Sequence, residues 1–201
     1  YDKNDNRIEE KTFADNAGAD QLQRQVETTF NQIDLITQIN QAGSVSQYNL
    51  DGYGNANSST DPNANPETEY QYDPLYRLTR LQDAIGNTTQ YDYNVKDQIV
   101  NVRTDNNAVT TYQYNDFGDL TQEDSPDRGV INYQYDNASN VTQLTDGRGV
   151  TSQYTYDALN RVTTVSYPDT SENITYQYDT CTNGLGRLCQ VTDPSGTTNF
   201  S

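Results

Sequence analysis

The feature that most constrains the fold of this chain is a tetrapeptide, Tyr-x-Tyr-Asp/Asn, that recurs about every 21 residues. The second tyrosine of the six clear copies lies at positions 72, 93, 114, 135, 156 and 178, so the steps are 21, 21, 21, 21 and 22 residues. Weaker copies precede them at 28–31 and 48–51, and Tyr1-Asp2 resembles a truncated copy. A constant period between 20 and 50 residues indicates a repeat architecture.

Each repeat has the pattern of a β-hairpin. A short turn, such as 158–160, follows the tetrapeptide, and a strand rich in β-branched residues, such as 161–165, comes next. A second turn, such as 146–149, precedes the returning strand, 150–156, which ends in Tyr-x-Tyr. Short strands between turns of Gly, Asn, Asp and Pro are typical of all-β proteins. The sequence therefore predicts an all-β fold of tandem β-hairpins.

The tyrosines and the aliphatic residues fix the faces of these strands. Alternation places both tyrosines of a pair on one face, where consecutive repeats would stack them into ladders. Aliphatic residues recur six and nine positions after the second tyrosine, as at Leu78 and Leu81 or at Val162 and Val165. One offset is even and the other odd, so either a β-bulge intervenes or both faces bury side chains. The repeat-defining tyrosines are Tyr70, Tyr72, Tyr91, Tyr93, Tyr112, Tyr114, Tyr133, Tyr135, Tyr154, Tyr156, Tyr176 and Tyr178.

The composition excludes several classes of partner. The chain has 12 basic and 29 acidic residues and a net charge of -17, which repels phosphate backbones and anionic lipid. We therefore expect neither nucleic acid nor a membrane surface as a partner. Only 32% of the residues are hydrophobic, as in disordered chains, but the 17 tyrosines, most of which recur periodically, oppose that interpretation. We find no apolar run long enough for a spanning helix and no signal peptide, and we expect Tyr1 to be a processed end or a cut within a longer protein.

We expect a single array of repeats over residues 1–201. Its first part, 1–69, has degenerate repeats with longer loops, and its second part, 70–201, has regular repeats of 21–22 residues. The stretch 56–68 is rich in Asn, Ser and Pro. It predicts an enlarged loop rather than a domain linker, because the repeats resume in register after it.

The first repeat is longer than the others and runs to Phe30. Its segment 19–27 has Leu22 and Val26 at helical spacing, which allows a short helix. A longer hairpin is the preferred prediction.

The repeat unit resembles the YD-repeat family, whose units are also called Rhs repeats. The pattern of that family is approximately Tyr-Asp-x-x-Gly-Arg-Leu-Thr, a variable stretch, Gly, and then Tyr-x-Tyr-Asp. Residues 72–93 match it, and 156–163 are as close, while 178–189 are similar to the family's extended repeat. The resemblance covers 70–201 strongly and 1–69 weakly.

This resemblance implies β-hairpin strips that spiral into a hollow shell, as in bacterial polymorphic toxins, insecticidal toxin complexes and teneurins. In the toxins the shell encloses a C-terminal effector. We therefore expect a curved, open strip of shell wall from a secreted or cell-surface bacterial protein, with further YD repeats of the same parent protein and an enclosed effector domain as partners. About nine hairpins would make a ribbon about 86 Å long, which is too short to close a shell. The sequence 193–196, Asp-Pro-Ser-Gly, shares letters with the family's self-cleaving segment but occupies an ordinary turn position.

We expect no catalytic residue, no metal site and no cofactor. The chain has no histidine, which removes Ser-His and Cys-His pairs and the usual zinc ligands. Glu123-Asp124 and Asp127 could act as paired carboxylates in a hydrolase, but we place them in turns, where acidic residues bond the local backbone. The acidic loops 51–55 and 146–149 could supply oxygen ligands to Ca²⁺, but they match no calcium-binding motif, and turn chemistry explains them.

Cys181 and Cys189 are a candidate disulfide. They lie eight residues apart, and closing this loop would contribute about 2–3 kcal/mol on the chain-entropy estimate. A disulfide would fit an oxidising, extracellular setting. The alternative is a pair of reduced thiols packed as small apolar residues.

The leading function is a structural one, a non-catalytic β-wall that encapsulates or presents a C-terminal effector. The alternative is a cell-surface binding module whose exposed tyrosine faces engage carbohydrates or proteins, because tyrosine offers a flat apolar ring with a polar tip. The first and last strands of such a strip expose unpaired edges, so end-to-end self-association is expected in either case.

Overall fold

A computed structural model describes residues 1–14, 21–41, 44–61 and 67–200 of the chain. The described residues form 18 β-strands and one short 3₁₀ turn, which confirms the predicted all-β fold of tandem hairpins. The chain divides into two compact units, each built from two segments. The first unit comprises Tyr1–Asp92 and Arg103–Asn107, and the second comprises Tyr93–Val102 and Ala108–Ser201.

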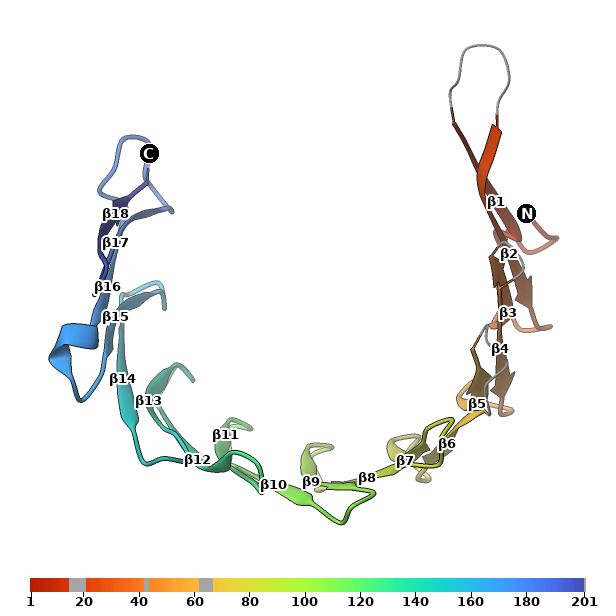
Figure 1. Ribbon diagram of the computed structural model, residues 1–201, viewed down its shortest axis with the longest axis horizontal. Helices are drawn as coiled ribbons and strands as arrows, with labels where there is room; N and C mark the ends of the chain where they lie inside the picture. The colour runs from red at the N-terminus through yellow and green to blue at the C-terminus, as the bar shows by residue number, and fades with distance from the viewer. Residues whose placement is uncertain (15–20, 42–43, 62–66, 201) are drawn as a thin grey trace. The chain divides into compact units, whose positions relative to one another are not determined.

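In the first unit each strand pairs antiparallel with the strand that follows it in the chain (Figure 1). Its strands are β1 (Glu9–Ala14), β2 (Gln21–Phe30), β3 (Ile36–Gln41), β4 (Ser44–Leu50), β5 (Ala56–Thr60), β6 (Thr68–Tyr72), β7 (Leu78–Gln82) and β8 (Thr88–Tyr93). The pairing of β1 with β2 is the long hairpin that the sequence favoured over a short helix. Residues 19–20 of the helix alternative lie outside the described residues.

The prediction of an enlarged loop over the whole of 56–68 is wrong, because the structure has β-strand within this stretch. β5 pairs with β4, with Asn49 opposite Ser58, and β6 begins at Thr68. Ser58 is buried at 6% exposure, because the neighbouring strands cover it on both sides. Small hydroxyl residues thus form strand here by pairing, although their composition is that of a loop. Residues 62–66 lie outside the described residues.

The second unit repeats the same antiparallel succession from β10 to β18 (Figure 1). Its strands are β10 (Val109–Tyr114), β11 (Leu120–Ser125), β12 (Gly129–Tyr135), β13 (Val141–Thr145), β14 (Thr151–Tyr156), β15 (Val162–Ser166), β16 (Ile174–Tyr178), β17 (Leu188–Asp193) and β18 (Gly196–Asn199). Strand β9 (Ile99–Thr104) has residues in both units, and the 3₁₀ turn η1 (Thr170–Glu172) precedes β16.

A β-bulge explains the mixed spacing of the aliphatic residues. Tyr70 lies opposite Leu81 and Tyr72 lies opposite Leu78, so two steps along β6 correspond to three steps along β7. Thr79 is therefore the extra residue, and the bulge brings both aliphatic side chains to the face that carries both tyrosines. The same register shift recurs at Phe30, Leu50, Tyr114, Tyr135, Tyr156 and Tyr178.

The hairpins bury little apolar surface completely. Ile131, Val165 and Cys189 are the most buried apolar side chains among the described residues, and no large side chain there is fully buried. The tyrosine face is half-buried, whereas the opposite face carries exposed amides such as Gln113 and Gln134. Cross-strand pairs and contacts between neighbouring repeats therefore provide most of the packing within each unit.

Candidate functional site

The aspartate or asparagine after each Tyr-x-Tyr pair organises the turn that follows it. Oδ1 of Asp157 accepts the backbone N–H of Leu159 at 2.9 Å and that of Arg161 at 3.0 Å. One side chain thus satisfies two donors that the tight turn leaves outside the strand ladder, as in an Asx turn. The same Oδ1 pattern occurs at Asp2, Asn31, Asp51, Asp73, Asn94, Asn115 and Asp136.

The residue four positions later closes the turn through the second carboxylate oxygen. Asn55 donates to Oδ2 of Asp51 at 3.0 Å, and Nε of Arg77 donates to Oδ2 of Asp73 at 2.7 Å. These side-chain bonds, with the backbone N–H groups, hold the pKa of both aspartates below its ordinary value. The spacing Asp-x-x-x-Asn/Arg recurs along the chain and is the sequence signal by which this role could have been predicted.

The second tyrosine of four pairs ties its repeat to the preceding one. The hydroxyl of Tyr135 donates to the carbonyl oxygen of Leu120 at 2.7 Å. The β11–β12 ladder ends at the Gln122–Asn132 pair, so this carbonyl lies beyond the ladder and the tyrosine supplies its donor. Burial raises the pKa of Tyr135, so its neutral, donating form is favoured. Equivalent bonds run from Tyr72 to Ala56, from Tyr114 to Ile99 and from Tyr156 to Val141.

All twelve repeat-defining tyrosines are half-buried. The first tyrosine of a pair lies opposite the second aliphatic residue of its hairpin, as Tyr133 lies opposite Leu144 and Tyr154 opposite Val165. Their rings therefore act in cross-strand packing, with little surface left for a ligand.

One hairpin carries a carboxylate at a position that is aliphatic in the neighbouring repeats. Glu123 lies opposite Tyr112, where neighbouring repeats have Leu or Val, and it is buried at 7% exposure. Its carboxylate is paired with the guanidinium of Arg128. The predicted turn position of Glu123 and Asp124 is wrong, because β11 extends through both and the turn is confined to the residues around Asp127. Consecutive strand residues point to opposite faces, so these two carboxylates do not form a pair for catalysis.

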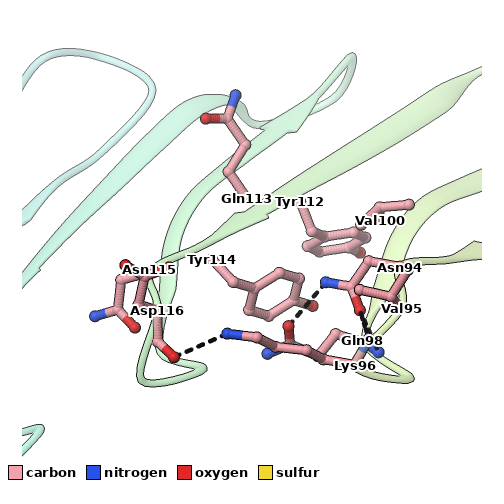
Figure 2. Close-up of a pocket in the computed structure, with 10 residues that line it drawn as sticks. All are labelled: Asn94, Val95, Lys96, Gln98, Val100, Tyr112, Gln113, Tyr114, Asn115 and Asp116. Atoms are coloured by element: carbon pink, nitrogen blue, oxygen red, sulfur yellow. Dashed lines mark hydrogen bonds between the residues drawn. The ribbon is translucent and has the colours of Figure 1, made fainter.

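A small pocket lies between two consecutive Asx turns, those at Asn94 and Asn115 (Figure 2). Its volume is about 210 Å³, below the roughly 300 Å³ of the smallest typical ligand sites. Nζ of Lys96 reaches across it and donates to the carbonyl oxygen of Asp116 at 2.9 Å, and the ring of Tyr114 lines it (Figure 2). The pocket thus lies where two neighbouring turns contact each other.

A disulfide closes the longest turn of the second unit. Cys181 and Cys189 are joined, with an S–S distance of 2.08 Å and a Cα–Cα distance of 5.3 Å. Gly184 lies against the bridge, and a Cβ there would come within 2.5 Å of Sγ of Cys181. Oδ1 of Asp179 accepts the backbone N–H of Gly186 at 2.6 Å. The disulfide and this bond hold the extended turn in place of the usual short one.

Arg161 links two consecutive turns. Its guanidinium contacts Oδ2 of Asp157 and Oδ2 of Asp179, each at 2.6 Å, and lies 4.3 Å from the ring centroid of Tyr178. The hydrogen bond with Asp179, followed by that with Asp157, raises the pKa of Arg161. This link could not be predicted from the sequence, because arginine also closes the turn at Asp73 without such a link to a second turn being evident from its spacing.

The oxygens considered for Ca²⁺ are already bonded within their own turns. Both oxygens of Asp51 are acceptors as described above, and Oδ2 of Asp146 accepts from the guanidinium of Arg148 at 2.7 Å. Across the described segments, no group of three or more His, Cys, Asp or Glu side chains is placed to hold a metal ion. No helix in this part of the chain has the length and apolarity to cross a membrane.

The geometry agrees with comparisons to known proteins. The Photorhabdus luminescens Tc holotoxin pore shares the fold, with a TM-score of 0.65 and 15% identity over 92% of this chain and 13% of that chain. The TcdB2–TccC3 complex gives a TM-score of 0.52 and 14% identity over 95% of this chain and 15% of that one. The chain therefore spans only a small part of these solved chains, and no curated protein matches it. The sequence profile of the Teneurin YD-shell family matches residues 1–201, so the chain belongs to the Teneurin YD-shell family.

Proposed function

We propose that this chain is a non-catalytic section of shell wall in an extracellular bacterial YD-repeat protein, where it forms one array with further repeats and helps to enclose or present a C-terminal effector. The family and the fold shared with the Tc holotoxin pore support the shell role.

The observation that carries the proposal is the tie between consecutive repeats. The hydroxyl of the second tyrosine donates to the carbonyl oxygen of the first residue of the preceding strand, at Tyr72, Tyr114, Tyr135 and Tyr156. Such a bond can recur for any number of repeats, because each repeat supplies both the donor and the acceptor. This arrangement is therefore suited to a wall built from any number of repeats.

The state of the carboxylates supports a role without catalysis. The aspartates of the turns accept backbone and side-chain donors, which lower their pKa values, and Glu123 is paired with Arg128. A general acid at neutral pH needs a raised pKa instead. The disulfide between Cys181 and Cys189 supports an oxidising compartment.

Protease protection tests the proposal in the natural protein that carries this chain. We expect the effector segment to resist digestion while the wall is intact, because the wall excludes the protease. The double variant Tyr135→Ala and Tyr156→Ala removes two ties and should expose that segment to cleavage. Ile85→Ala, at an exposed turn residue, is the matched control and should leave the protection unchanged. Digestion of the effector in the unaltered protein to the same extent as in the double variant would refute enclosure.

A further inference from the structure

Two exposed tyrosines from consecutive turns of the first unit are in ring contact. Tyr53 follows the Asx turn residue Asp51, and Tyr76 follows the equivalent Asp73. Their ring centroids are 4.8 Å apart and the ring planes are inclined at 53°. A hydrogen bond between the two side chains raises the pKa of Tyr76. The two turns therefore bring the rings into contact.

The pair is open to solvent, unlike the repeat-defining tyrosines. Tyr53 is 76% exposed and Tyr76 is 49% exposed. Of the 17 tyrosines, all of which lie in the described residues, only Tyr1 is comparably exposed, at 77%. A dissolved oxidant therefore meets the Tyr53–Tyr76 pair before the half-buried ladder.

The backbone of Tyr76 shows that this contact has a cost in the turn. Tyr76 has a φ of +62°, in the left-handed region that bulky residues rarely adopt. Equivalent turn positions carry small polar residues or glycine, namely Asp34, Gly54, Asp97, Gly118, Ser139 and Asn160. The turn itself therefore has no need of tyrosine, and the strained residue indicates a role for its side chain.

We propose that Tyr53 and Tyr76 form a site of oxidative cross-linking, at which a one-electron oxidant such as a haem peroxidase with hydrogen peroxide joins them as dityrosine. Each phenol loses one electron and one proton. The two radicals couple through ring carbons next to the hydroxyl-bearing carbons, and the hydrogens on the coupled carbons move to the phenol oxygens as the rings regain aromaticity. The two electrons and two protons reduce one hydrogen peroxide to two waters. The product joins two consecutive repeats covalently at their turns.

The test oxidises the natural protein with a haem peroxidase and limiting hydrogen peroxide at low protein concentration. Monomeric product is isolated by size exclusion and digested, and mass spectrometry identifies linked peptides while fluorescence reports dityrosine. We expect one dominant link within the chain, between Tyr53 and Tyr76. Tyr53→Phe and Tyr76→Phe should each abolish it, because phenylalanine keeps the ring packing but forms no phenoxyl radical.

Tyr1→Phe is the matched control, because Tyr1 is as exposed as Tyr53 but lies outside the pair. This variant should form the link at the unaltered yield, and circular dichroism should show the same fold in all variants. The proposal is overturned if the monomer contains no Tyr53–Tyr76 peptide, or if links among other tyrosines form in equal yield. It is also overturned if dityrosine occurs only in dimers.

Discussion

The hydroxyl of Tyr135 donates a 2.7 Å hydrogen bond to the carbonyl oxygen of Leu120, a residue of the preceding repeat. The ring of the same tyrosine lies opposite Val141 in its own hairpin. One side chain thus packs within its hairpin and bonds to the hairpin before it. This double role explains why the repeat uses tyrosine, since phenylalanine would lose the bond and serine would lose the ring.

Replacing Tyr135 by phenylalanine tests that role. The ring packing is retained, but the carbonyl of Leu120 loses its donor, so we expect the free energy of unfolding to fall by about 1 kcal/mol. Urea unfolding followed by circular dichroism measures the change. Tyr1→Phe, at an exposed position, should stay within about 0.5 kcal/mol of the unaltered protein. Equal stability of Tyr135→Phe and the unaltered protein would show that the bond contributes nothing.

The buried carboxylate of Glu123 gives a second prediction. Glu123→Leu places an aliphatic residue in a row that has Leu or Val in neighbouring repeats, so stability should be unchanged or higher. Arg128→Ala leaves the buried carboxylate unpaired, and stability should fall, though modestly because the Arg128 side chain is 61% exposed.

The double variant Glu123→Leu with Arg128→Ala completes the cycle. Without the carboxylate, loss of Arg128 should cost almost nothing, so the double variant should match Glu123→Leu in urea unfolding. A further loss in the double variant would mean that Arg128 stabilises the turn by another contact.

The pH dependence of stability follows from the turn carboxylates. Hydrogen bonds lower the pKa of ten aspartates among the described residues of the folded protein. They are Asp2, Asp51, Asp73, Asp83, Asp136, Asp146, Asp157, Asp169, Asp179 and Asp193. A lowered folded pKa gives stability that is complete above about pH 4, the ordinary value for unfolded aspartate, and that is lost as the pH falls through the folded values.

Between about pH 5 and 8 the urea midpoint should be flat, because the chain has no histidine and its cysteines are joined. Acid also reduces the net charge of -17, and the relief of repulsion acts in the opposite direction. Urea midpoints measured from about pH 8 down to below about pH 4 therefore compare the two effects. A midpoint that rises below pH 4 would show that repulsion outweighs the turn hydrogen bonds.

The disulfide should stabilise the protein by about 2–3 kcal/mol, on the chain-entropy estimate for so short a loop. Reduction of the unaltered protein and the double variant Cys181→Ser with Cys189→Ser should lower the urea midpoint alike. The double variant itself should not respond to the reductant, which makes it the control for side effects of the thiol reagent. A reduced protein as stable as the oxidised one would show that the other contacts of the turn, such as the bond from Gly186 to Asp179, hold it without the disulfide.

The repeat and the hairpins could be predicted because tyrosine and turn residues recur at a fixed period. The sequence could not distinguish a β-bulge from burial on both faces of the sheet, because either would explain one even and one odd spacing of the aliphatic residues. The hydroxyl of Thr79 bonds the carbonyl of Gln71 across the bulge at 3.1 Å, but threonine is common in strands and marks no bulge by itself.

Contacts between turns could not be predicted from the sequence, for a different reason. Tyr53 and Tyr76 lie in separate hairpins, and their contact depends on the register that the bulges set. Glu123 was predicted in a turn because the Ser-Pro-Asp sequence close to it is a strong turn signal. The ion pair that neutralises its buried carboxylate depends on how that turn brings Arg128 back to the strand.

Electron cryomicroscopy of the natural protein that carries this chain tests the shell role most directly. We predict a map in which these hairpins form part of the wall of a hollow shell, with Tyr72, Tyr114, Tyr135 and Tyr156 each bonded to the preceding repeat. A map in which the hairpins lie outside any enclosed space, with the tyrosine ladder in contact with a ligand or a partner, would contradict the shell role and favour a binding module.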